Sequence, residues 1–487
     1  MAKTIKDLEP KIVWKNFYEL TQIPRPSYHE EKAVAFLKAF GEKLKLETIV
    51  DEVGNVIIRK PATKGMENRK GLVLQAHIDM VPQKNSNVKH DFKKDPISTC
   101  IGDDGWVRAQ DTTLGADNGM GLAAILAVLE SKDIKHGPIE ALLTATEETG
   151  MDGANGLKGG ILKGDILINL DSEDEGELYI GCAGGIDASV EFKYKKEAVP
   201  ADYEAFQIYV KGFKGGHSGM DINTGRGNAN RILFRYLNMI KDRWQAELSH
   251  VEAGSLRNAI PREAFATVLI PEKHSKDIKA CVKNYEAVIK NELGEVEPDL
   301  EIGIKKIKMP EYIIDKKTQL NLIRSIIACP NGVIRMSTSM QGLVETSTNL
   351  AIVNMDGEKI YVKCLLRSSV DSAKDALAAS VKACFDLAGA KTVLDGSYPG
   401  WKPNTNSEIL HLAQKLYKTK FKKETKIMAV HAGLECGILG AKYPNWDMIS
   451  FGPTIRHPHS PDEKVNIESV GKFYDFLKLI VENAPKK

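Results

Sequence analysis

Residues 139–153 read IEALLTATEETGMDG, an apolar run followed by two glutamates and a glycine-containing loop. The apolar run from 139 to 146 predicts a buried strand, and the glycines at 150 and 153 mark the loop that follows it. Glu147 and Glu148 stand where the strand ends. Neighbouring residues on an extended chain point to opposite faces, so we expect the two carboxylates to serve different neighbours.

Two like charges at the end of an apolar strand resist burial unless cations or protons compensate them. For an arbitrary glutamate pair, a solvated loop is the ordinary interpretation, because glutamate is usually exposed. The residues around Glu147 and Glu148 therefore have to decide between a surface loop and a functional site.

Short apolar strands alternate with helices on both sides of this stretch. Two amphipathic helices are expected within 4–48, the second beginning at a capping box formed by Ser27 and Glu30. Further strands are expected at 71–76 and 165–170, with a helix of small residues at 121–129. This rhythm predicts an α/β fold with a mostly parallel, mixed sheet and helices on both faces.

The pattern changes after the glycines at 184 and 185 and returns after a turn-rich joint at 396–404. Between these points, strands at 205–210 and 359–366 alternate with long helices at 227–241 and 371–387. We therefore predict a catalytic domain formed by residues 1–186 and 400–487, with an inserted α/β domain at 187–399. Insertion of this kind is consistent with the length of 487 residues, which is too long for one core.

Composition excludes several classes of function. The 67 basic and 65 acidic residues nearly balance, so neither nucleic acid nor an anionic membrane is expected as a partner. The seven cysteines are scattered and never form C-x-x-C, which argues against a disulfide framework and a thiolate zinc site. There is no signal-like N-terminus and no run of 18 apolar residues, so we expect a cytoplasmic protein.

Polar residues follow one expected strand after another. His77 and Asp79 follow the strand at 71–76, and Asp171 follows the strand at 165–170. Asp117 stands near the start of the small-residue helix, and His459 follows an apolar strand at 448–451. Two histidines and several carboxylates suit zinc, manganese or cobalt better than calcium. A carboxylate shared between two ions would give a hydrolytic site of the two-metal type.

Six segments together carry a resemblance to a known family: AHIDM, TTLGADNGMG, TATEETGMDGA, NLDSE, GGHSGMDI and HSPDE. Their residues and order resemble metallopeptidase family M20, and the length and large insertion resemble its aminoacyl-histidine dipeptidase branch. The resemblance covers essentially the whole chain and implies a zinc-peptidase-like catalytic domain with an inserted lid that binds substrate.

The resemblance implies two divalent metal ions, zinc first, with cobalt or manganese as alternatives. It assigns the ions to His77, Asp117, Glu148, Asp171 and His459, with Asp117 bridging them. Glu147 would be the general base of a water activated by the two metals, and Asp79 would hold His77. A cis peptide bond between Asp117 and Asn118 is a further expectation. The HSPDE match selects His459 over His457.

By the same resemblance, His217 would stabilise the oxyanion, Asn258 and Arg367 would hold the substrate's terminal carboxylate, and Gly433 would add a backbone contact. Aspartate at 171 is typical of relatives that act on free amino termini. The leading expectation is thus a dipeptidase that cleaves Xaa-His dipeptides, including β-alanyl-histidine, and other dipeptides. The alternatives are an amidohydrolase acting on N-acyl amino acids or tripeptides, and a catalytically silent metal- or peptide-binding protein. The oligomeric state is left open between a monomer and a homodimer.

Overall fold

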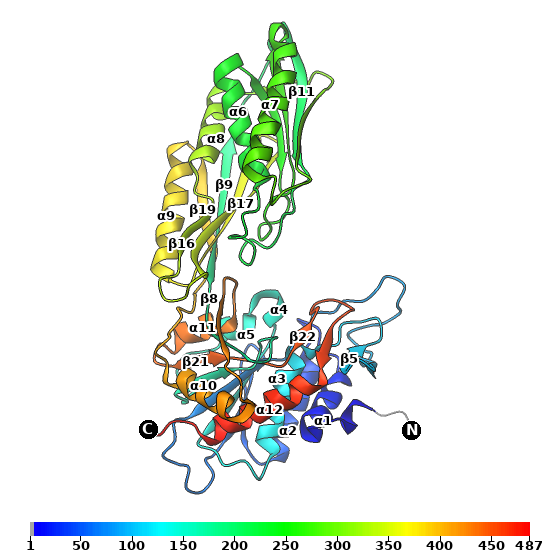
Figure 1. Cartoon of the computed structure of the whole chain (residues 1–487), viewed down its shortest axis with the longest axis vertical. Helices are drawn as coiled ribbons and strands as arrows, with labels where there is room; N and C mark the ends of the chain where they lie inside the picture. Colours follow the sequence, from blue (N-terminus) through cyan, green and yellow to red (C-terminus); the bar gives the residue numbers. More distant parts are fainter. Residues whose placement is uncertain (1–3) are drawn as a thin grey trace. The chain divides into compact units, whose positions relative to one another are not determined.

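A computed structural model describes residues 4–487 and divides them into two compact units (Figure 1). The first unit comprises residues 4–181, 403–429 and 434–487, and the second comprises 182–402 and 430–433. Within residues 4–487, no helix combines the length and the apolar content that crossing a membrane requires.

The two units differ from the expected domains in three short segments. Residues 182–186 and 400–402 group with the second unit, although both were expected in the catalytic domain. Residues 430–433 group with the second unit, although 400–487 was expected to be one continuous piece of the catalytic domain. Backbone hydrogen bonds explain the difference, because the Ala183 amide donates to the carbonyl oxygens of Val430 at 3.1 Å and Ala432 at 3.0 Å. Gly433 therefore belongs to the second unit.

The first unit is built on an eight-stranded mixed sheet of order β1-β2-β6-β3-β7-β21-β8-β20. Neighbouring strands among β6, β3, β7 and β21 are parallel, whereas β1–β2, β2–β6 and β21–β8 are antiparallel. The strand bounds are β1 (Glu47–Val50), β2 (Val56–Lys60), β3 (Leu72–His77), β6 (Ile139–Thr144), β7 (Ile166–Asn169), β8 (Glu177–Cys182), β20 (Lys426–Val430) and β21 (Asp447–Ser450). All residues of β3, β6 and β7 are buried, as expected of parallel strands covered on both faces.

Helices surround this sheet, and a small second sheet of order β22-β23-β5-β4 completes the unit. The helix α3 is apolar on all sides and contacts β3, α1 and α12, so it is a core helix. The helix bounds are α1 (Lys11–Thr21), α2 (Glu31–Lys43), α3 (Ala116–Glu130), α4 (Glu147–Gly150), α5 (Asp152–Gly156), α10 (Glu408–Phe421), α11 (Glu435–Lys442) and α12 (Ile467–Glu482), with a 3-10 turn η1 (Ile5–Asp7). The small strands are β4 (Thr99–Ile101), β5 (Trp106–Ala109), β22 (Ile455–Arg456) and β23 (Lys464–Asn466).

The second unit contains an antiparallel sheet of order β14-β11-β13-β12-β17-β18-β9-β19, with β16 also paired to β17. Its strands are β9 (Gly184–Lys193), β11 (Tyr203–Lys211), β12 (Glu247–Ala253), β13 (Ala264–Pro271), β14 (Glu301–Lys306), β16 (Gly332–Met336), β17 (Val344–Asp356), β18 (Lys359–Ser368) and β19 (Lys391–Tyr398), beside a two-stranded ladder of β10 (Lys196–Glu197) and β15 (Ile313–Ile314). The expected strands and long helices of the insertion are all present in this unit.

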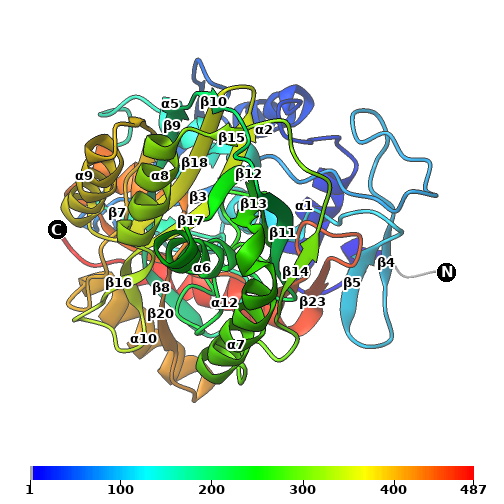
Figure 2. The same ribbon diagram turned by 90° about the horizontal axis from the view of Figure 1, so that it is seen from above.

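Helices cover one face of this sheet (Figures 1 and 2). They are α6 (Ala229–Trp244), α7 (Ser275–Leu293), α8 (Lys316–Ala328) and α9 (Asp371–Leu387), with a 3-10 turn η2 (Glu272–His274). Alternate residues of β9 and β18, such as Val190 and Val362, join the core beneath these helices. The intervening residues, among them Gly185, Asp187 and Arg367, lie on the opposite face of the sheet.

Two local expectations were wrong. Glu147 and Glu148 do not continue an extended strand, because β6 ends at Thr144 and Thr146 turns the chain at a φ of 53° into the short helix α4. Donor atoms of both glutamates nevertheless lie within 4.8 Å of one another and of a His77 ring nitrogen. The capping box is also absent, since the Ser27 hydroxyl donates to Asp79 and Glu30 accepts from Thr146.

Candidate active site

The polar residues named from the sequence gather at one edge of the first unit's sheet. The parallel strands β3, β6 and β7 end at His77, Thr144 and Asn169, and the carboxyl ends of parallel strands share one edge. Asp79, the glutamate pair and Asp171 follow these ends directly. Asp117 joins them from the start of α3, where its peptide bond to Asn118 is cis, as expected.

Asp117 lies between two histidines. Its Oδ1 is 3.1 Å from His77 Nε2, and its Oδ2 is 3.3 Å from His459 Nε2. Asp171 Oδ1 lies 3.3 Å from His77 Nε2, and Glu148 Oε2 lies 2.9 Å from His459 Nε2. The arrangement thus has two halves, each with one imidazole and one carboxylate of its own, and Asp117 belongs to both.

These residues form groups that could hold metal ions. The donor atoms of His77, Asp117 and Asp171 lie within 4.8 Å of one another, and so do those of Asp117, Glu148 and His459. A tetrahedral zinc ion with bonds of about 2.1 Å would hold its ligand atoms about 3.4 Å apart, close to the distances found here. Imidazole and carboxylate donors are also the set that zinc, manganese and cobalt accept. The residues present therefore fit two divalent ions.

The pKa shifts of the site residues also favour bound metal ions. Burial raises the pKa of Asp171 to about 6, with Asp117 and Glu148 adding repulsion. Hydrogen bonds to Asp117 and Glu148 raise the pKa of His459 to about 11. Burial opposes charge on His77, but Asp171, Asp117 and Asp79 together hold its pKa well above the usual range. Such a crowd of carboxylates requires positive charge, which divalent ions would supply.

The two glutamates occupy different surroundings. Glu148 contacts His459 through Oε2, while its buried Oε1 has no hydrogen-bond partner among residues 4–487. A buried acceptor without a partner is what a missing ligand would leave. Glu147 instead groups with His77 and Glu148, and burial raises its pKa well above the usual range, with Asp171, Glu435 and Glu148 adding repulsion. A carboxylate whose pKa is raised binds a proton more readily, as a general base requires.

Asp79 supports this site through hydrogen bonds to the residues that form it. Its buried carboxylate accepts the backbone N–H groups of Glu147 at 2.9 Å and Glu148 at 3.2 Å, and the Ser27 hydroxyl at 2.7 Å. His77 Nδ1 lies 3.3 Å from Asp79 Oδ1 and 3.2 Å from the Asp79 carbonyl. Asp79 therefore orients the imidazole of His77 and fixes the start of α4.

Sequence reasoning missed several residues that support the site. Arg25 is 1% exposed, and its guanidinium donates to the carbonyl oxygens of Ile78 at 2.8 Å, Asp79 at 2.9 Å and Gly115 at 2.5 Å. The Glu463 carboxylate accepts four successive backbone N–H groups, those of Leu114, Gly115, Ala116 and Asp117. The Asn118 amide donates to Asp171. Glu463 and Asn118 each had a signal, because they lie in the HSPDE and TTLGADNGMG segments.

The four residues assigned to substrate binding all belong to the second unit. His217 and Asn258 lie on two loops joined by a β-bridge between His217 and Ala259 and by a bond from the Ser218 amide to the Asn258 carbonyl at 2.8 Å. Arg367 donates from Nη1 to the Tyr398 hydroxyl at 3.0 Å, and Gly433 packs beside the same ring.

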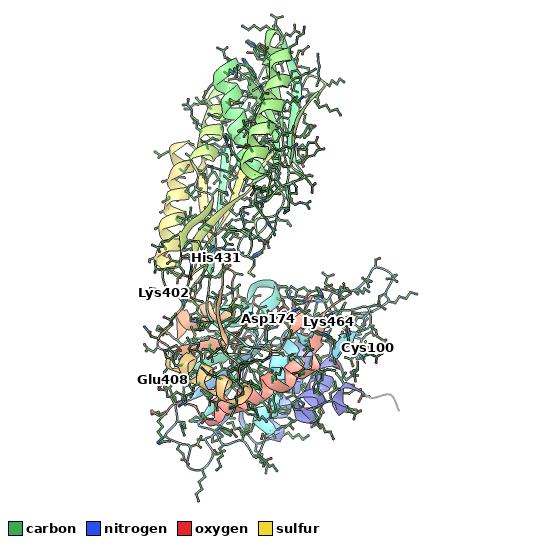
Figure 3. The ribbon with its side chains drawn as sticks, in the orientation of Figure 1. Cys100, Asp174, Lys402, Glu408, His431 and Lys464 are labelled. Atoms are coloured by element: carbon green, nitrogen blue, oxygen red, sulfur yellow. The ribbon has the colours of Figure 1, made fainter. Side chains whose placement is uncertain are left out.

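His431, labelled in Figure 3, links the two pairs. Its Nε2 is 2.7 Å from the Ser347 hydroxyl, and Gly219 lies directly against its carbonyl oxygen. Burial, together with Arg367 and His217, lowers the pKa of His431 to about 3. The second unit thus brings His217, Arg367 and a neutral histidine into one polar cluster.

A sheet edge that gathers two histidines and three carboxylates around a shared aspartate is typical of metal-dependent hydrolases. Residues 73–483 match the model of peptidase family M20/M25/M40. The chain belongs to this family and is a peptidase.

Particular relatives match over the full length. The cytosol non-specific dipeptidase of Escherichia coli (strain K12) is 48% identical over 483 residues, which cover 99% of each chain. The crystal structure of aminoacylhistidine dipeptidase from Vibrio alginolyticus is 47% identical, with a TM-score of 0.95 over 100% of this chain and 99% of that one. Aminopeptidase PepT from Bacillus cereus, at 16% identity and a TM-score of 0.57, shares the fold.

Proposed function

We propose that this peptidase is a cytoplasmic metal-dependent dipeptidase that cleaves Xaa-His dipeptides, including β-alanyl-histidine, and other dipeptides. The observation that carries the proposal is the Asp117 carboxylate, which lies between His77 at 3.1 Å and His459 at 3.3 Å and so joins two groups of metal-ligand type. The substrate class is supported by the two relatives that are 47–48% identical over nearly the whole chain and bear dipeptidase names.

The first unit would supply the chemistry. We assign two divalent ions to two sets of ligands that share Asp117, namely His77 and Asp171 in one and Glu148 and His459 in the other. When bound, such ions lower the pKa of water and polarise a carbonyl. Glu147 would take a proton from the attacking water and give it to the leaving amine, which its raised pKa supports. Asp79 would hold His77 and the amide of Glu147 in place.

The second unit would supply substrate binding, as a lid domain does. Arg367 and Asn258 are assigned to the terminal carboxylate, because a guanidinium fork matches a carboxylate with two parallel hydrogen bonds. His217 is assigned to the oxyanion and Gly433 to a backbone contact. Burial and Arg367 lower the pKa of His217, so it is a neutral hydrogen-bond donor near pH 7.

A substrate panel tests the proposal. The purified chain is stripped with a chelator, reloaded with zinc, manganese or cobalt, and offered β-alanyl-histidine, other dipeptides, a tripeptide and an N-acetyl amino acid. We expect release of free histidine from β-alanyl-histidine, loss of that activity after chelation and its return on reloading. Preferential release of acetate would favour the amidohydrolase, and a metal-loaded protein inert toward every substrate would favour a binding protein. Light scattering of the same sample distinguishes a homodimer from a monomer.

A further inference from the structure

Arg367 is a buried cation with unused donors. The residue is 6% exposed, and its Nη1 donates to the Tyr398 hydroxyl at 3.0 Å. Its buried Nε has no hydrogen-bond partner among residues 4–487. A guanidinium carries five N–H donors, and buried donors are almost always paired in folded proteins. The free donors therefore indicate that this guanidinium receives a ligand with acceptor oxygens.

The charge of Arg367 is offset only in part, by its electrostatic interaction with Asp187. The carboxylate that faces it on the sheet, Asp187, forms an ion pair with Arg257 at 2.8 Å. The partner that does hold Arg367 is a phenol, and burial raises the pKa of Tyr398. His431 is neutral as well, because its pKa lies at about 3. Arg367 thus has an uncharged hydrogen-bond partner in Tyr398, which leaves the rest of the guanidinium available to an anion.

The sheet register explains how Tyr398 reaches Arg367. Ser347, Arg367, Gly185 and Tyr398 stand directly opposite one another across β17, β18, β9 and β19. Residues paired in this way point to the same face of a sheet. The Tyr398 ring extends over Gly185, since a Cβ at Gly185 would lie 2.6 Å from its hydroxyl oxygen. Because Gly185 has no side chain, the Tyr398 ring can lie over it and its hydroxyl can reach the guanidinium.

The other end of this row is closed by a second fixed contact. Ser347, which is 1% exposed, meets His431 Nε2 at 2.7 Å. Gly219 lies against the His431 carbonyl, so the loop that carries His217 packs on the same residue. Arg367 thus lies in a row of paired strand residues between Ser347, which contacts His431, and Tyr398, which contacts the guanidinium.

From this geometry we infer that Tyr398 is a positioning residue, whose hydroxyl holds the Arg367 guanidinium in the orientation that receives the terminal carboxylate of a dipeptide. This inference rests on the function proposed above. Gly185 is part of the same arrangement, because a larger residue at this position would displace the Tyr398 ring.

The test compares a dipeptide with its C-terminal amide, using the metal-loaded full chain. Tyr398→Phe keeps the ring and removes only the hydroxyl. We expect the KM for the dipeptide to rise about ten- to a hundredfold, the range for one hydrogen bond to a charged group, with kcat within about twofold. The KM for the amide should stay unchanged, because the amide has no carboxylate for Arg367 to bind.

Matched variants separate positioning from general damage. Tyr194→Phe removes a hydroxyl that donates to the Gly357 carbonyl at 2.8 Å in the same unit, and both substrates should keep their wild-type constants. Arg367→Lys should raise the dipeptide KM further, and adding Tyr398→Phe to it should have little extra effect, because both act through one guanidinium. Gly185→Ala should reproduce the pattern of Tyr398→Phe.

Equal rises in KM for the dipeptide and its amide, or independent effects of Tyr398→Phe and Arg367→Lys, would overturn the inference. The proposed function is tested separately, by whether the wild-type protein turns over dipeptides. The positioning role of Tyr398 is tested by the ratio of the KM for the dipeptide to the KM for its amide, compared between the wild type and Tyr398→Phe.

Discussion

Replacing Asp79 by asparagine should weaken the site without abolishing it. The Asp79 carboxylate accepts from Ser27, Glu147 N–H and Glu148 N–H and lies beside His77. An asparagine keeps only one of the two oxygens. If the new NH2 group faces Ser27 and Glu148, the Ser27 hydroxyl can turn and accept a hydrogen bond from it. The Glu148 N–H then has no acceptor and is left unpaired.

The magnitude follows from these contacts. An unpaired buried N–H costs about 1–3 kcal/mol, and loss of the charge weakens the remaining bonds by about 1 kcal/mol. The free energy of unfolding should therefore fall by about 2–4 kcal/mol. His77 keeps its contact with the Asp79 carbonyl at 3.2 Å, so its orientation is loosened but not lost. Changes to such supporting groups typically reduce metal affinity or activity by about 10- to 100-fold.

Three measurements on the Asp79→Asn protein check this reasoning: urea unfolding, zinc affinity by competition with a chelator, and dipeptide turnover at saturating metal. Asp165→Asn is the matched control, because its carboxylate accepts the Gly71 amide at 2.8 Å at the opposite end of the strands. That variant should keep metal affinity and turnover. Wild-type affinity and turnover in Asp79→Asn would refute the role given to this carboxylate.

Three further predictions test separate parts of the structure. Arg25→Lys should lower the free energy of unfolding by about 3 kcal/mol, because an ammonium cannot bond three carbonyl groups in the plane of a guanidinium; an unchanged urea midpoint would contradict this. His459→Ala should lower the metal-to-protein ratio measured by elemental analysis, while His457→Ala should not; equal ratios in the two variants would remove His459 from the ligand set. Unfolded His431 binds a proton near pH 6.5 but the folded residue only near pH 3, so it makes stability fall by about 1.4 kcal/mol per pH unit on acidification between these values. Urea unfolding of His431→Gln should therefore show a flatter pH dependence, and an unchanged slope would contradict the burial of a neutral imidazole.

Much of this arrangement was accessible from the sequence. Polar residues placed just after apolar strands predicted a common edge, because parallel strands align their carboxyl ends. The helix expected at 371–387 is α9, and the strand expected at 359–366 lies within β18. The choice of His459 over His457 agrees with the geometry, since His459 and not His457 shares a donor group with Asp117.

Other features depend on contacts that no local pattern encodes. Glu463 reaches the Asp117 amide across 346 residues of sequence, and Arg25 reaches the Gly115 carbonyl across 90. The left-handed turn at Thr146 converted an expected strand end into a helix and brought both glutamates to one centre. Ser27 was expected to cap a helix because its spacing to Glu30 fits a capping box, yet α2 begins at Glu31 and the Ser27 hydroxyl donates to the Asp79 carboxylate instead.

We propose that Glu147 moves the proton while the neighbouring carboxylates hold metal. The most direct measurement is dipeptide turnover by metal-loaded Glu147→Gln protein, with metal content determined on the same sample. We expect an unchanged metal-to-protein ratio and a turnover lower by at least about a hundredfold. Turnover near the wild-type rate at full metal content would contradict it.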